Sequence, residues 1–127
     1  MDRVLTEEQA VEALEKAVKC FDADLKKDDK AALKKGFVSG RLIFNEKDES
    51  FTVYLIKPIE LENGEKIGSI NISEPTFEQL EAAGKSTNQF EQAIDLISNM
   101  SGIGKGIIRR LKMRDLNLFG AVMGFFG

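Results

Sequence analysis

The sequence predicts an α+β fold: an N-terminal helix, a small antiparallel β-sheet of three to four strands, and a C-terminal bundle of three to four short helices. Two changes of hydrophobic period carry this prediction. Apolar residues recur every three to four positions at first, β-branched and aromatic runs replace them between 42 and 72, and helical spacing returns from 76 onward. A length of 127 residues with 43% hydrophobic and 31% charged residues fits one domain. We divide this domain into a helical N-terminal segment 1–36, a β-sheet region 37–73 and a helical region 74–127.

The N-terminal helix begins at a capping box, because Thr6 is followed three residues later by Gln9. The apolar residues that follow form a narrow stripe: Val11, Leu14, Val18, Phe21 and Leu25. This stripe packs either on the sheet of its own chain or, as the alternative, against a second copy in a homo-oligomer through Val11, Leu14, Val18 and Phe21. Residues 22–35 continue the helix or form a turn and a second short helix, and Gly36 is the predicted C-cap.

Two runs of β-branched and aromatic residues, 42–44 and 51–56, predict a hairpin because a polar turn separates them. The dipeptide Asn63-Gly64 favours a second tight turn, which leads into a strand over 67–72. Pro58 either ends the second run or marks a sheet edge, because proline cannot donate to the ladder.

The C-terminal part reads as a series of short helices. Thr76 and Gln79 form another capping box, and residues 105–112 predict a short basic helix. Between them, residues 89–100 place four apolar side chains inward: Phe90, Ala93, Ile94 and Ile97. Asp115 is the predicted cap of the last helix, which carries five apolar residues on one side: Leu116, Phe119, Val122, Met123 and Phe126.

Missing residue types narrow the chemistry. Without histidine there is no Ser-His-Asp machinery and no zinc site of the usual kinds. No pair of carboxylates stands out as a catalytic dyad, so nothing in the sequence favours an enzyme, although one that uses carboxylates alone stays open. We predict no metal and no cofactor. Cys20 is the sole cysteine and is expected to be a buried, unreactive helix residue. The sequence shows no signal peptide, and its apolar end is too short to span a bilayer, so we expect a cytoplasmic protein without membrane contact.

Charge is unevenly distributed along the chain. The net charge of −3 divides into −2 over residues 1–50, −5 over 51–99 and +4 over 100–127. In the basic part, a glycine-rich turn resembles a helix-hairpin-helix element, which would bind a DNA phosphate through backbone N–H groups and nearby cations. The residues of this alternative are Gly102, Gly104, Lys105, Arg109 and Arg110. The same turn is a poor phosphate-binding loop, because it follows a helix and lacks the Ser or Thr that holds a metal. The other interpretation is a plain helix–turn–helix corner whose cations lie near a helix C-terminus, and the acidic net charge of the chain argues against DNA binding.

The last twelve residues, 116–127, contain no charge and are mostly apolar. Such a tail either closes the core of its own domain or is offered to another chain. On the second interpretation the partner-binding residues are Leu116, Phe119, Val122, Met123 and Phe126, since Met and Phe suit adaptable contacts with an apolar helix.

Several short motifs in fixed order resemble one family. They begin with a strand, a Pro-Ile pair and an acidic glycine turn over 54–67, followed by Ile-Asn-Ile-Ser-Glu-Pro-Thr over 70–76. A Leu-Ile pair and Met-Ser-Gly end a helix over 96–102, Leu-x-x-x-Asp spans 111–115, and an apolar helix closes the chain. Together they are similar to the tail assembly chaperones of Mu-like contractile-tailed bacteriophages, over about residues 53–127.

This resemblance implies a chaperone without enzymatic activity. It would bind the tape measure protein, keep it soluble and bring the tail tube protein to it during tail tube assembly. Ser73 stands where the family usually has arginine, so a contact made by that arginine is absent here. Residues 1–50 lie outside the resemblance, which assigns them no role.

Overall fold

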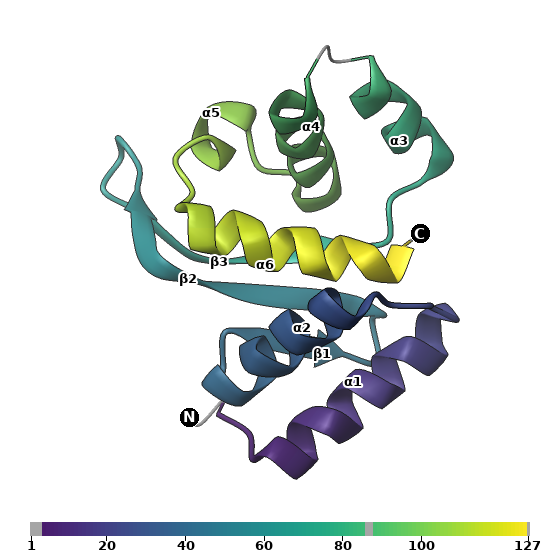
Figure 1. Cartoon of the computed structure of the whole chain (residues 1–127). Coiled ribbons are helices and arrows are strands. Elements are labelled where there is room, and N and C mark those ends of the chain that lie inside the picture. Colours follow the sequence, from purple (N-terminus) through teal and green to yellow (C-terminus); the bar gives the residue numbers. More distant parts are fainter. Residues whose placement is uncertain (1–3, 86–87, 127) are drawn as a thin grey trace.

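The computed structural model describes residues 4–85 and 88–126, and it confirms the α+β prediction. Helices gather on one side of a three-stranded antiparallel sheet with strand order β1-β2-β3 (Figure 1). Along the chain the elements are α1 (Glu7–Phe21), α2 (Lys27–Ser39), β1 (Leu42–Asn45), β2 (Ser50–Glu60), β3 (Lys66–Ser73), α3 (Phe77–Gly84), α4 (Gln89–Ser101), α5 (Lys105–Ile108), α6 (Met113–Met123) and the 3₁₀ turn η1 (Gly124–Phe126).

The predicted capping box starts α1: the Thr6 hydroxyl accepts from the Gln9 N–H, and the Gln9 side chain accepts from the Thr6 N–H. The apolar stripe of α1 faces mostly inward, since Leu14, Val18 and Phe21 pack against the core of the same chain. Val11 is 38% exposed, so it is the stripe member most available to a second copy. The homo-oligomer hypothesis therefore stays a prediction.

The predicted C-cap of the next helix was wrong. Residues 22–26 form a connection and α2 continues through Gly36 to Ser39, ending at Gly40, whose φ is 76°. Gly36 lies inside α2 because a Cβ there would approach Leu118 Cδ1 to 3.0 Å and Leu42 Cβ to 3.2 Å. Close packing therefore explains the glycine at position 36, and a left-handed backbone explains the glycine at position 40.

The sheet has three strands, at the lower end of the prediction. Phe51, Val53 and Leu55 of β2 are buried under the helices, and the residues between them are more exposed, as expected for a half-buried strand. The pairing of β2 with β3 becomes irregular between Tyr54 and Ile59, and β1 pairs with β2 only as far as Val53. Pro58 lies in the stretch of β2 that this pairing leaves out, which agrees with its prediction as an edge marker.

The remaining helices begin as the local signals indicate, with two corrections. The capping box at Thr76 is present, and Asn88 caps α4 by accepting from the Glu91 N–H. The predicted break between α3 and α4 includes residues 86 and 87, which lie outside the described residues. The basic helix predicted over 105–112 is shorter, covering Lys105–Ile108. Asp115 does not cap α6, because that helix begins at Met113 and Asp115 is a buried residue of its first turn.

Helix α6 is the centre of the molecule. Figure 1 shows it between the α1–α2 pair and the α3–α5 group, in front of the sheet. Its inward residues Phe119 and Val122 are fully buried. At its C-terminal end, Phe125 stacks on Phe51 with ring centroids 4.8 Å apart. The rings of Phe21, Phe44 and Phe126 complete this aromatic cluster.

Candidate functional site

The five tail residues predicted to bind a partner do not share one surface. Phe119 and Val122 face the core and are inaccessible, while Phe126 joins the aromatic cluster. Leu116 and Met123 lie on another side of α6, where they line an open cavity. Helix α6 therefore has two apolar faces: one closes the domain, as one interpretation of the tail required, and the other is a candidate for partner contact.

The accessible face of α6 forms an apolar groove with α4. The groove encloses about 290 Å³. Its α4 side is formed by Phe90, Ala93, Ile94 and Ile97, and its α6 side by Met113, Leu116, Asn117, Gly120 and Met123. Among the described residues of this lining, Asn117 is the one polar residue and none carries a formal charge. We call this feature the α4–α6 groove.

Two large side chains at the groove are strongly exposed. Phe90 is 69% exposed and Met113 is 59% exposed, whereas Ile97 on the same lining is buried. The prediction that Phe90 faces inward was wrong: Phe90 in the first turn of α4 is exposed, whereas Ile97, two turns further along the same helix, is buried. Sequence reasoning missed Phe90 and Met113 as site residues, since apolar spacing alone does not tell which turn of a helix is covered.

Two acidic residues of α4 form ion pairs with cations of the same chain. Arg109 donates to the Glu91 carboxylate at 2.6 Å, and Lys105 pairs with Asp95 at 2.9 Å. Both acidic residues belong to α4, and both cations belong to α5 and its C-cap. These ion pairs fasten α5 to α4.

The same contacts bear on the nucleic-acid alternative. Gly102 has a φ of 75° and ends α4, with its N–H bonded to the Ser98 carbonyl. The Ile103 N–H is bonded to the Ser101 hydroxyl, so two N–H groups of the turn already have partners inside the chain. With Lys105 and Arg109 in ion pairs, this hypothesis remains a prediction that no structural observation favours.

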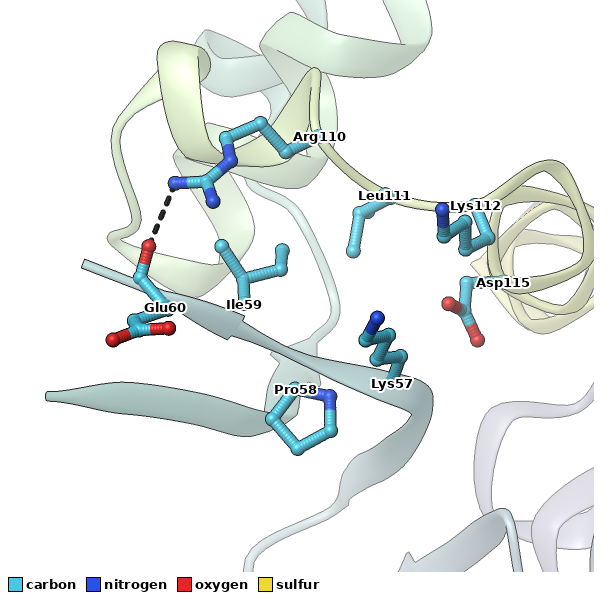
Figure 2. A pocket seen from close by; sticks show the side chains of 8 residues that line it. All are labelled: Lys57, Pro58, Ile59, Glu60, Arg110, Leu111, Lys112 and Asp115. Atoms are coloured by element: carbon cyan, nitrogen blue, oxygen red, sulfur yellow. Dashed lines mark hydrogen bonds between the residues drawn. The ribbon is translucent and has the colours of Figure 1, made fainter.

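A second hollow lies where β2 meets the α5–α6 connection, and it is polar. Figure 2 shows Lys57, Arg110 and Lys112 around it, with Arg110 donating to the Glu60 carbonyl at 2.9 Å. Asp115 forms part of its wall; its carboxylate accepts from Arg41 and, at 3.3 Å, from the Ile56 N–H. Among the described residues, these contacts join β2 and Arg41, the residue before β1, to α6. We therefore assign the residues around this hollow a structural role.

Reactive chemistry has little basis in the described part of the chain. No group of three or more His, Cys, Asp or Glu residues there is arranged to hold a metal ion. Cys20 is exposed, which corrects the expectation of a buried residue. Partial desolvation, followed by the Glu49, Glu46 and Glu74 carboxylates, raises the pKa of its thiol, opposite to the activation of a nucleophilic cysteine. Within residues 4–85 and 88–126, no helix is long and apolar enough to cross a membrane.

Comparison with known proteins identifies the class. A family model described as phage tail assembly chaperone proteins, E, or 41 or 14, matches residues 52–127, which is more than half of the chain. The chain belongs to this family of phage tail assembly chaperones. No curated protein and no solved structure matches it. Both helices of the α4–α6 groove lie inside the matched residues.

Membership of the family has two direct consequences. A chaperone of this family binds other proteins of the tail, and its role lies in tail assembly. A protein of this kind needs apolar surface that stays accessible in the free molecule. The α4–α6 groove has this property.

Proposed function

We propose that this protein binds the tape measure protein, keeps it soluble and promotes tail tube assembly by bringing tube subunits to it, all through non-enzymatic contacts. The supporting observation is the α4–α6 groove, whose side chains Phe90 and Met113 are exposed in the free chain. Exposed apolar surface with a polar surround is typical of sites that receive an amphipathic helix. Methionine at such a surface adapts its shape to different partners.

Deletion of the apolar tail cannot test this proposal. Deleting the apolar tail would remove Phe119, Val122 and Phe125 from the core, so the chain would unfold whatever its function. Point variants at exposed positions avoid this problem. Phe90 and Phe77 form a matched pair, since both are exposed phenylalanines in the first turn of a helix but only Phe90 lines the groove.

The test is co-expression of the tagged full chain with the tape measure protein of the same tail gene cluster, followed by pull-down. We expect the wild-type chain and Phe77→Ser to retain soluble tape measure protein, and Phe90→Ser to lose most of it. If the wild-type chain retains none although the tape measure protein is well expressed, the proposed function is wrong. Equal losses for both serine variants would show that contact is not centred on the groove.

A further inference from the structure

We infer that this chain forms a two-fold dimer, in which the outer edge of β3 pairs antiparallel with the same edge of β3 in a second copy and the two sheets become one continuous sheet. This inference does not depend on the proposed function. It begins from the backbone groups of β3, which is an outer strand of the sheet. Each backbone N–H and C=O group needs a hydrogen-bonding partner in the protein or in water.

The direction of each backbone group of β3 follows from the pairing of the sheet. The Tyr54 N–H donates to the Arg41 carbonyl, so the even-numbered residues of β2 from 50 to 54 direct their backbone groups toward β1. The odd-numbered residues there bond to β3, where Ile70 and Ile72 lie opposite them. The alternate residues of β3 therefore direct their N–H and C=O groups away from β2, toward the outer edge: Ser69, Asn71 and Ser73.

These outward groups have no partner in the part of the chain that the structure describes. Over residues 4–85 and 88–126, no backbone hydrogen bond joins β3 to any element other than β2. The side-chain bonds of Asn71 go to hydroxyl groups of the same sheet and leave the backbone of the edge untouched. Ser69, Asn71 and Ser73 are all exposed. A row of free N–H and C=O groups at a sheet edge is a template for another strand.

The two outer strands of the sheet differ in how they are protected against pairing. Proteins protect an edge strand by making it short, or by placing a lysine, a proline or a bulge in it. Strand β1 is short, with four residues. In β3, Lys66 and the irregular pairing with β2 lie toward the N-terminal end. The stretch from Ile67 to Ser73 contains no charged residue and no proline, so its edge lacks these protections.

This stretch is complementary to itself in one antiparallel register. With Asn71 opposite the second copy's Asn71, Ile70 lies opposite Ile72 and Ser69 lies opposite Ser73. Each pair joins residues of the same face, because both isoleucines are buried under the helices and the other three residues are exposed. The outward N–H and C=O groups meet each other in this register. A shift by one residue would place isoleucine opposite a polar residue.

A second copy fits this edge better than an unrelated strand does. Pairing of β3 with β3 is isologous, so one contact covers the unprotected edge of both chains at once and the assembly closes as a dimer. The strands left at the ends of the joined sheet are then the two short β1 strands. A strand from another protein would need the same alternation of apolar and polar residues, which β3 already has.

The test places charges at the two-fold position of the pairing. Asn71→Lys sets two lysines directly opposite each other, which opposes association. Asn45→Lys is the matched control, because Asn45 of β1 donates to the same two hydroxyl groups as Asn71 does, but lies on the other outer strand. The full chain and each variant are measured by sedimentation velocity over a concentration series, with circular dichroism to compare their folding.

We expect the mass of the wild-type chain to rise with concentration from that of one chain toward that of two. Asn45→Lys should behave in the same way, whereas Asn71→Lys should stay monomeric. Asn71→Asp should also be monomeric alone but form dimers when mixed with Asn71→Lys, since opposite charges then face each other. A wild-type chain that stays monomeric at millimolar concentration would overturn the inference, as would equal association of Asn71→Lys and Asn45→Lys.

Hydrogen exchange of the wild-type chain, measured by nuclear magnetic resonance, gives a second reading that needs no variant. The N–H groups of Ser69, Asn71 and Ser73 should exchange more slowly as the concentration rises, because they become bonded in the dimer. A dimer that leaves their exchange unchanged would place the contact elsewhere on the chain and contradict the inference. Protection that appears only when another tail protein is added would identify a strand of that protein as the occupant, and would also contradict it.

Discussion

Replacing Arg41 by methionine is the sharpest test of how the molecule is held together. The Arg41 guanidinium donates to the Asp115 carboxylate, which is 1% exposed and also accepts from the Ile56 N–H. Arg41→Met keeps much of the aliphatic volume but leaves a buried carboxylate with one backbone donor. Removing one member of a buried ion pair costs about 3–5 kcal/mol. Because the Arg41 side chain is 29% exposed, water replaces part of the lost interaction, and we expect a loss of about 2–3 kcal/mol.

This loss is measurable without unfolding the protein, since domains of this size have stabilities of about 5–15 kcal/mol. Urea denaturation followed by circular dichroism should show a lower midpoint with an unchanged m value, and the melting temperature should fall by roughly 6–15 °C. Arg114→Met is the matched control, because none of the salt bridges among the described residues involves Arg114. Its effect should stay within about 0.5 kcal/mol.

A double-mutant cycle separates the ion pair from other effects of each change. Asp115→Asn keeps an acceptor for the Ile56 N–H and removes only the negative charge. Combined with Arg41→Met, it should give a coupling free energy of at least about 1 kcal/mol. A coupling below about 0.5 kcal/mol, or a cost of Arg41→Met no larger than that of Arg114→Met, would refute the assignment of a stabilising role to this pair.

Four further substitutions and one chemical modification have definite expected outcomes. Gly120→Ala should raise the free energy of unfolding by about 0.5–1 kcal/mol in the same urea assay, because no described atom outside α6 lies within 4 Å of its Cβ position. Gly36→Ala should lower it by about 1–3 kcal/mol, because its Cβ would press into the core. A change of the same sign in both variants would contradict the packing described. Phe125→Ala should lower the free energy of unfolding by about 3–5 kcal/mol, and Phe126→Ala should lower it less, since Phe126 is only half-buried. A larger loss for Phe126→Ala would contradict the burial of Phe125 in the aromatic cluster. Because its thiol pKa is raised, Cys20 holds less thiolate at a given pH, so the midpoint of its alkylation by iodoacetamide against pH should lie above that of a cysteine in an unstructured peptide. A midpoint at or below the peptide value would contradict the influence of the neighbouring carboxylates.

Features that depend on neighbours in sequence were predictable, and those that depend on neighbours in space were not. The helix starts at Thr6 and Thr76 could be predicted because a capping box is complete within four residues. Strand runs were equally local. The role of Asp115 was misread because its partner Arg41 is 74 residues away, and Gly36 was taken for a C-cap because Leu118 is nowhere near it in the sequence.

The candidate site followed the same division. The tail was recognised as important from composition alone. One side of α6 closes the core, and the partner surface that we propose lies on another side. Which residue belongs to which side depends on where α4 lies. The groove therefore became visible only when Phe90 and Met113 were placed beside Leu116 and Met123.

The position of β2 has a consequence for how such chaperones are divided. The family match starts at residue 52, two residues after β2 begins, and so excludes β1 and the α1–α2 pair. Yet Phe119 and Val122 of the matched part are buried in a core to which Phe37 of α2 and Leu42 of β1 also belong. A fragment cut at the family boundary would lose an edge of its sheet and expose the back of α6. We expect that a recombinant of two relatives, natural or engineered, folds only when its N-terminal segment and its helix α6 come from the same parent protein.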